Sequence, residues 1–309
     1  MFSGQGSHYF QMGRELYDRH AGFRAAVDRL DALARSVIGE SPIKQAYRGE
    51  KTGTFDRLLH THPAIFIIEH ALAECLIEDG IVPDMTLGAS LGTFAAASIA
   101  GFINTEQALR AVIAQAQVVE SNCEPGGMTA IVDEPALFEM PFIRERSTMA
   151  GVNFSGHFVV SAGASDLHAI ENVLRSRNIV HQRLAVHYAF HSHGIDSARS
   201  DAIAQLHPLP VKNGRLPMAC CGSAAIHTTA FAPAHLWDVV RGPVRFADTI
   251  AHLEAQGAWR YLDVGPSGTL ATFTKYAMPK ESASSATVVL TPFGRDVKNY
   301  EALTGKSVC

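Results

Sequence analysis

The chain has no strong excess of one charge, no membrane-length apolar run and few cysteines. Its 26 basic and 30 acidic residues leave a net charge of −4 without a long basic run, which argues against a nucleic-acid partner. No apolar stretch reaches the ~20 residues that span a bilayer, and no signal-peptide pattern opens the chain, so we expect no membrane contact. The five cysteines are scattered and odd in number, which is typical of reduced thiols. We therefore predict a cytoplasmic protein without a disulfide framework.

Neither a repeat nor a low-complexity linker interrupts the chain. Because 47% of the residues are hydrophobic, we expect one large or two smaller globular domains. Segments of helical periodicity alternate with short apolar segments, which predicts the α/β class. The clearest helices are expected at 63–78 and at 105–120, the latter after Asn104 as N-cap. Cys220 and Cys221 lack a spacing typical of metal ligands, and we predict neither a metal nor a cofactor.

The pattern of elements changes between residues 125 and 187. Strands are expected at 128–132, 148–153, 157–162 and 180–186, and helices at 135–146 and 166–177. This β-α-β-β-α-β order resembles a small ferredoxin-like unit. We therefore predict a ferredoxin-like subdomain at 125–187, inserted into a large subdomain that consists of residues 1–124 and 188–309.

The most informative motif is Gly88-Ala89-Ser90-Leu91-Gly92. It has the G-x-S-x-G pattern of a nucleophile elbow, in which a serine lies on a sharp turn between a strand and a helix. The glycines allow strand and helix to pass closely, and the free amide of Leu91 at the helix start can face an oxyanion. A five-residue match also arises by chance in many proteins. The expected strand at 81–87 and helix at 93–100 favour the elbow over an ordinary turn.

A serine is a weak nucleophile unless a base removes its proton. Among the 15 histidines, His191 is the best local candidate because it directly follows the predicted insertion. His187 and His193 are its competitors, and a histidine chosen at random is more often a surface or core residue. A third motif, Gly4-Gln5-Gly6, would let Gln5 approach a ligand closely, although an ordinary glycine turn is the simpler interpretation of this motif alone.

Together these motifs resemble the malonyl-CoA:acyl-carrier-protein transacylase family, and most of all the acyltransferases of polyketide synthases. The resemblance covers essentially the whole chain, and the motifs occur in order. They are 2–7 (FSGQGS), 61–66 (THPAIF), 88–92 (GASLG), 126–128 (GGM), 153–163 (NFSGHFVVSAG), 188–192 (YAFHS), 243–246 (PVRF) and 263–266 (DVGP).

The resemblance implies an α/β-hydrolase-like subdomain with an inserted ferredoxin-like one, and an active site in the cleft between them. It implies that Ser90 becomes acylated and that His191 acts first as general base and then as general acid. A backbone carbonyl would orient this histidine, so no triad aspartate is required. The backbone amides of Gln5 and Leu91 would form the oxyanion hole.

The resemblance also implies the partners and the residues beside the substrate. An acyl carrier protein is the expected partner, and acyl-CoA is a further acyl source. His62, Asn153 and Phe190 are assigned to the substrate site. A structural role in the turn that contains Asn153 explains this residue equally well.

Two positions depart from the family pattern. Members that load malonyl groups carry an arginine that grips the free carboxylate, and this position is Gln115 here. Arg110 lies about 140° around the same helix and cannot replace it. The elbow has Ala89 in place of the usual histidine, which enlarges the acyl pocket, admits water or is neutral. We therefore expect an acyl group without a terminal carboxylate, unless the register is shifted or another arginine enters the site.

These departures leave several functions open. A glutamine at the arginine position resembles the acyl hydrolases of trans-acyltransferase polyketide pathways, which release acyl groups from carrier proteins, and this is our prediction. Transfer of a non-carboxylated acyl group to a carrier protein is the alternative, followed by malonyl transfer. A degenerate docking domain without catalytic activity is disfavoured because Ser90, His191 and Gln5 are intact.

Overall fold

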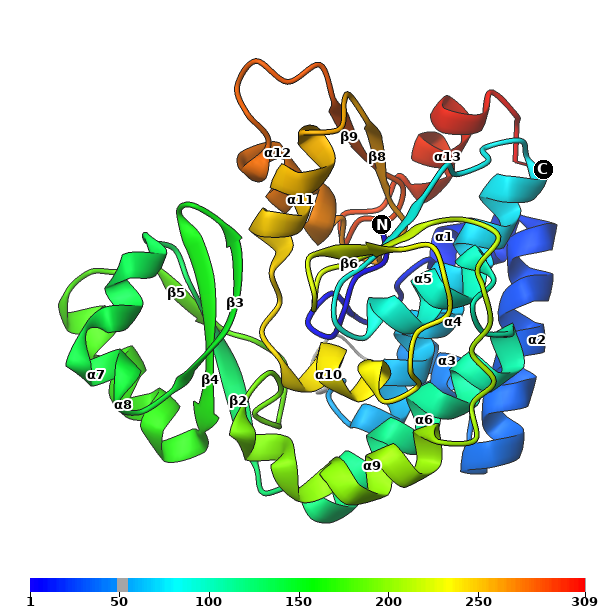
Figure 1. Cartoon of the computed structure of the whole chain (residues 1–309). Helices are drawn as coiled ribbons and strands as arrows, with labels where there is room; N and C mark the ends of the chain where they lie inside the picture. The colour runs from blue at the N-terminus through cyan, green and yellow to red at the C-terminus, as the bar shows by residue number, and fades with distance from the viewer. Residues whose placement is uncertain (49–54, 309) are drawn as a thin grey trace.

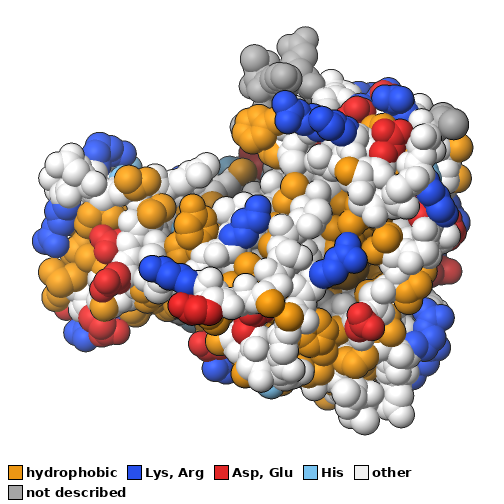
Figure 2. All heavy atoms as spheres, turned by 90° about the horizontal axis from the view of Figure 1, so that it is seen from above, with side chains coloured by type: hydrophobic (Ala, Val, Ile, Leu, Met, Phe, Trp, Pro, Cys, Tyr) orange, Lys and Arg blue, Asp and Glu red, His pale blue; other side chains and the backbone are white. Residues whose placement is uncertain are grey.

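A computed structural model describes residues 1–48 and 55–308. Figure 1 shows a larger part in which helices surround short, mostly parallel strands, and a smaller part, drawn in green, with its own sheet. In the part of the chain that the structure describes, no helix has the length and apolar character needed to cross a membrane. Figure 2 shows basic and acidic side chains interspersed on the upper face, without a patch of one sign.

The strands of the larger part form two sheets that the N-terminal residues join. β1 pairs with β6 in parallel, β6 with β7 antiparallel, and β8 with β9 in parallel. The bounds are β1 Thr86–Gly88, β6 Met218–Cys220, β7 Ala225–His227, β8 Arg260–Asp263 and β9 Ser285–Val288. Phe2 bridges to Gly88, and the Met1 carbonyl accepts from the amide of Val264. The start of the chain therefore lies between β1 and β8.

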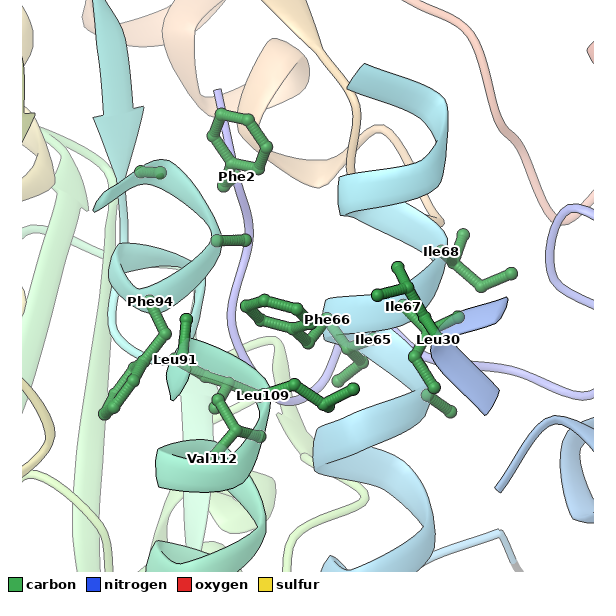
Figure 3. Close-up of a cluster of buried hydrophobic side chains, with 14 of the residues drawn as sticks. Phe2, Leu30, Ile65, Phe66, Ile67, Ile68, Leu91, Phe94, Leu109 and Val112 are labelled. Atoms are coloured by element: carbon green, nitrogen blue, oxygen red, sulfur yellow. The ribbon is translucent and has the colours of Figure 1, made fainter. Parts of the chain in front are cut away.

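The core of the larger part is centred on α4, which is buried on nearly all sides. In Figure 3, Phe66 of α4 points toward Leu91 and Phe94, while Ile67 lies beside Leu30 of α2. The helices of this part are α1 Arg14–Arg19, α2 Ala21–Ile38, α3 Pro42–Arg48, α4 Leu58–Glu78, α5 Gly92–Ala100, α6 Thr105–Asn122, α9 Arg199–Leu206, α10 His235–Arg241, α11 Phe246–Glu254, α12 Thr269–Ala277 and α13 Asp296–Thr304, and a 3-10 helix spans His193–Ala198.

The elements of the larger part confirm some of the sequence predictions and correct others. The helix after Asn104 is confirmed, and the Asn104 side chain accepts from the amide of Gln107. The helix expected at 63–78 begins five residues earlier, because the buried Leu58 and Leu59 extend the apolar surface beyond Pro63. The strand expected at 81–87 is wrong in length: only 86–88 pair with a neighbour.

The smaller part is a four-stranded antiparallel sheet with the strand order β3-β4-β2-β5. Its elements are β2 Gly126–Ile131, a 3-10 helix at Pro135–Glu139, α7 Pro141–Arg144, β3 Thr148–Phe154, β4 His157–Gly163, α8 Ala164–Ser176 and β5 His181–Arg183. Side chains alternate between its faces. Ile131, Phe158 and Val160 pack in one cluster with Ile170 of α8, whereas other strand positions face a cleft toward the larger part.

Candidate active site

Ser90 lies on the turn between β1 and α5 in a strained backbone conformation. Its φ is 54°, a region that residues with a side chain rarely adopt. A Cβ on Gly88 would lie 2.5 Å from the Cα of Thr93, and a Cβ on Gly92 would clash with the backbone of Phe2. Strand, turn and helix thus pass each other at distances that only glycine permits, which is the geometry of a nucleophile elbow.

His191 lies against this turn from a segment 101 residues later in the chain. The Ser90 Oγ donates a hydrogen bond of 2.8 Å to the His191 Nε2. The His191 Nδ1 donates to the Gly242 carbonyl at 2.7 Å, and the His191 backbone amide donates to the Val240 carbonyl at 2.9 Å. The carbonyl on Nδ1 fixes the tautomer, so Nε2 is the nitrogen that can accept the serine proton.

The electrostatics of the site keep His191 neutral. Burial lowers the pKa of His191 to about 4, while the Gly242 carbonyl acts in the opposite direction. His191 also has a positive φ of 60°, so both members of the dyad occupy strained backbone positions. Near neutral pH the imidazole is therefore a free base, already hydrogen-bonded to the Ser90 hydroxyl.

The amides expected to form the oxyanion hole lie at the same end of the cleft. Leu91 is the N-cap residue of α5, where amides lack intrahelical partners. Gly4 passes so close that a Cβ there would lie 3.0 Å from the Cβ of Ser90, and Gln5 follows it. In the described residues, neither the Gln5 nor the Leu91 amide donates to another protein group. The oxyanion role of these amides stays a prediction, and their position is compatible with it.

A buried carboxyl group anchors the Gly4–Gln5 turn. The amide and the hydroxyl of Ser3 each lie 2.7 Å from Oε1 of Glu69, which is on α4. Burial raises the pKa of Glu69 to about 8, and the Ser3 donors oppose this rise. The Ser7 hydroxyl in turn donates to the Gly4 carbonyl at 2.8 Å. These bonds fix the backbone that presents the Gln5 amide.

The dyad opens into a cleft of ≈ 350 Å³. One side, here called the catalytic wall, consists of Gln5, Ser90, Leu91 and His191. The opposite side, here called the sheet wall, belongs to the four-stranded sheet and consists of Met128, Ala130, Ala150, Val159 and Leu184. Within the described residues, no lysine, arginine, aspartate or glutamate lines this cleft.

Comparison with known proteins identifies the family. The sequence model of the protein family described as acyl transferase domain matches residues 1–307. The chain belongs to the acyl transferase domain family. It is 40% identical over 98% of its length to polyketide biosynthesis acyltransferase homolog BaeD of Bacillus velezensis, and 37% identical over 98% to the homolog PksD of Bacillus subtilis; 94% of each relative is covered.

Solved structures of acyl transferase domains bear out the fold class. The acyltransferase domain from the second module of the salinomycin polyketide synthase has a TM-score of 0.85 and 29% identity, over 98% of this chain and 70% of that chain. The expected α/β-hydrolase-like fold with a smaller sheet-containing subdomain is therefore confirmed. The boundaries at 124/125 and 187/188 stay a prediction.

The acyl transferase fold brings most of the substrate residues predicted from the sequence into the cleft. Ala89, Phe190, Asn153 and His62 all line it. The Asn153 side chain donates to the Nδ1 of His157 at 3.0 Å, which gives it a structural bond as well.

The predicted substrate residues His62 and Gln115 lie in different cavities. His62 packs against Phe190, with ring centroids 5.6 Å apart, and burial lowers the pKa of His62 to about 3. Gln115 does not line the cleft. It is buried on α6 beside a separate small cavity, with Phe94, Leu206 and Trp237.

Some functional groups of this domain carry no signal in the sequence. The Gly242 carbonyl that orients His191 is a backbone group, which no residue type identifies. Glu69 looks like an ordinary position on an apolar helix, and only its contact with Ser3 reveals its role. Leu270 and Phe273 of α12 reach the cleft from far along the chain. Only three-dimensional packing brings these groups together.

Proposed function

We propose that this protein is an acyl-carrier-protein hydrolase of polyketide biosynthesis, which forms an acyl-Ser90 intermediate and releases the acyl group to water. The observation that carries the proposal is the pairing of an intact Ser90–His191 dyad with a cleft that contains no charged residue in its described lining. The dyad supports acyl-enzyme chemistry, and the lining supports an acyl group without a carboxylate. The names of the two Bacillus relatives support polyketide biosynthesis.

Acylation begins with the neutral His191. Its Nε2 takes the Ser90 proton while Oγ attacks the thioester carbonyl, and the amides of Gln5 and Leu91 stabilise the resulting oxyanion. Collapse of this intermediate breaks the C–S bond, and the proton on Nε2 passes to the departing thiol of the carrier protein. In the second half, His191 takes a proton from water as water attacks the ester carbonyl, and returns that proton to Ser90 Oγ as the bond between Oγ and the acyl carbon breaks. The products are a free carboxylic acid and the regenerated dyad.

The lining of the cleft argues against a malonyl substrate. A buried carboxylate without a cationic partner costs several kcal/mol in real proteins. Family members that bind malonyl groups are expected to use an arginine, and the corresponding residue here is the neutral Gln115, outside the cleft lining. The apolar side chains of the sheet wall favour short or medium acyl chains.

Unsatisfied polar atoms in the cleft support water as the final acceptor. Both ring nitrogens of His62 and both amide atoms of the Gln5 side chain are buried without a hydrogen-bond partner in the described residues. Such groups attract ordered water or a polar part of the substrate. A water molecule held by His62 or Gln5 would lie in the cleft that contains Ser90.

Transfer of a non-carboxylated acyl group is the second candidate function. It shares the acyl-Ser90 intermediate and differs only in the group that resolves it. The family itself and the relatives named acyltransferase homologs favour this alternative. Transfer of a malonyl group, whether from malonyl-CoA or from one carrier protein to another, has the least support.

The decisive experiment supplies acetyl- and malonyl-loaded carrier protein to the enzyme together with an excess of unloaded carrier protein. We expect free acetate as the main product, with little acyl group on the second carrier protein and slow malonyl release. Mass spectrometry of both carrier proteins measures the partition. Rapid malonyl transfer with little hydrolysis would overturn the proposal.

A pair of variants at His62 tests the role of water. His62→Leu removes the unsatisfied ring nitrogens, and we expect the acetyl-enzyme to accumulate because deacylation slows. His62→Gln keeps polar atoms at this position and serves as the matched control, with near-normal deacylation. Equal deacylation rates in both variants would show that His62 does not position the attacking water.

A further inference from the structure

A second cluster of reactive side chains lies outside the catalytic cleft. Cys220, His227 and His235 each offer a ligand atom, and these atoms all lie within 4.8 Å of one another. None of the three lines the cleft that contains Ser90. We propose that this cluster is a binding site for a zinc-like divalent transition metal, with the Cys220 thiolate and two imidazoles as its protein ligands.

The fold brings the three ligands together from separate elements. Cys220 ends β6 and His227 ends β7, and the register pairs Cys220 with Ala225 and Met218 with His227. Because side chains alternate, Cys220 and His227 emerge on the same face of this antiparallel pair. His235, the first residue of α10, completes the set. A cysteine and two histidines on three elements therefore converge on one point.

One distance between two ligand atoms matches the value for a tetrahedral ion. The Cys220 Sγ lies 3.5 Å from the His235 Nε2. For a metal with Zn–S and Zn–N bonds of ordinary length, two such ligands of a tetrahedron are about 3.6 Å apart. A thiolate combined with imidazoles selects zinc and similar metals over Mg²⁺ or Ca²⁺. Three protein ligands leave a fourth position for water or another donor.

The surroundings hold the ligands in place. Cys220 is fully buried. The ring of Phe231 packs edge-on against both His227 and His235, with centroid distances of 5.4 Å in each case. The two imidazoles lie with centroids 4.9 Å apart. An apolar cover of this kind limits solvent access to a metal and fixes the orientation of its ligands.

The position of the site connects it with the catalytic histidine. His235 begins α10, and the Val240 and Gly242 carbonyls at the other end of that helix bind the backbone and the ring of His191. The seven-residue helix spans about 10 Å. A metal at its start would anchor α10, and through it the carbonyls that orient His191. The role proposed for the metal is therefore to hold α10 in position.

Metal binding is tested on the whole protein, after treatment with a chelator. Zinc is titrated in competition with a chromophoric chelator, and Co²⁺ is added as a spectroscopic probe. We expect one equivalent of metal per chain, a thiolate-to-cobalt charge-transfer band and a higher Tm with zinc. Absence of stoichiometric binding would show that the cluster is only a thiol hydrogen-bonded to imidazole, and would overturn the proposal.

Variants identify the ligands. Cys220→Ser and His227→Gln should each weaken zinc binding at least about tenfold, and Cys220→Ser should abolish the charge-transfer band. Cys123→Ser and His207→Gln are matched controls outside the cluster and should leave the affinity unchanged. His227 is only half-buried, so this variant tests the site even if Cys220→Ser does not fold. A charge-transfer band that persists in a folded Cys220→Ser protein contradicts the assignment.

Discussion

The two walls of the cleft are built in different ways. On the catalytic wall, hydrogen bonds and strained backbone hold the groups proposed to react: Ser90 and His191 have positive φ, and Gly242 fixes the imidazole. The sheet wall consists of apolar side chains that point from alternate strand positions, such as Met128 and Ala130. The catalytic wall therefore depends on exact backbone geometry, whereas the sheet wall depends on the size of its side chains.

This difference separates chemistry from selectivity. A substitution on the catalytic wall removes a reacting group or its orientation, and should lower kcat for every acyl chain. A substitution on the sheet wall changes the space for the acyl chain and leaves the dyad in place. It should alter the preference among substrates while the best substrate reacts normally.

The largest effect is expected for Ser90→Ala. Without Oγ no acyl-enzyme forms, and we expect kcat to fall by about 10⁴-fold or more for all acyl chains. Intact-protein mass spectrometry should show the acyl adduct in the native protein and not in the variant. Ser176→Ala, an exposed serine on α8, is the control and should behave like the native protein. An unchanged rate in Ser90→Ala would exclude the dyad from the reaction.

The pH dependence of kcat/KM tests the burial of His191. With a pKa of about 4, the imidazole is mostly neutral at pH 5, whereas an ordinary histidine is mostly protonated. At pH 5 the neutral fraction of His191 is therefore about 30-fold larger than that of an ordinary histidine. We therefore expect kcat/KM to stay nearly constant from pH 8 to pH 5. A decline centred near pH 6.5 would contradict this assignment.

The same shift in pKa affects stability, with a definite sign. The pKa of His191 in the folded state is below the value of 6.5 in the unfolded state, so the unfolded chain binds the proton more readily. The contribution of neutral His191 to stability is present above pH 6.5 and declines as the pH falls toward about 4. Circular dichroism at each pH of the rate profile separates this unfolding from loss of the base.

The sequence pointed to the residues that line the catalytic wall, but not to the groups that hold them in position. The glycines on either side of Ser90 are required because the backbone passes too closely there for a side chain. This requirement is local, so the elbow could be recognised from five residues. The expected order of strands and helices between residues 125 and 187 likewise predicted a ferredoxin-like unit, and a four-stranded antiparallel sheet lies there. The strand at 81–87 was overestimated, since apolar residues alone do not provide a pairing partner.

Long-range contacts account for what the sequence did not reveal. Glu69 and Ser3 are 66 residues apart, and the spacing of Cys220, His227 and His235 fits no common metal motif. Counting back from Gly127-Met128 to the position of the family arginine placed Gln115 at the substrate, whereas Gln115 and Trp237 line a separate small cavity. Such relationships arise from packing between elements, which periodicity and motif spacing do not encode.

On the sheet wall, a reciprocal pair of variants should change chain-length selectivity. Ala130→Leu fills part of the cleft, and we expect kcat/KM for longer acyl chains to fall about tenfold relative to acetyl. Met128→Ala enlarges the cleft and should shift the preference toward longer chains. Competition between acyl-loaded carrier proteins of different chain length measures the ratio. If Ala130→Leu lowers the rate equally for all chains, the separation between the two walls is wrong.

The smallest catalytic change is expected for Gln115→Arg, at the separate small cavity beside α6. Gln115 is buried, and its Oε1 lacks a hydrogen-bond partner among the described residues. A guanidinium there is costly without an anion, so we expect a lower Tm. The longer side chain should extend toward the cleft and raise malonyl acylation of Ser90 a few-fold, because the malonyl carboxylate pairs with it. Intact-protein mass spectrometry after incubation with malonyl-loaded carrier protein measures the gain.

Gln117→Arg is the matched control for this prediction, since Gln117 lies on the same helix and is exposed. It should change neither the Tm nor malonyl acylation. If Gln115→Arg folds and malonyl acylation does not increase, a cation at this position does not reach the acyl group. Selectivity against malonyl would then come from the uncharged lining of the cleft alone. The residues of the two walls would in that case determine which acyl groups the enzyme accepts.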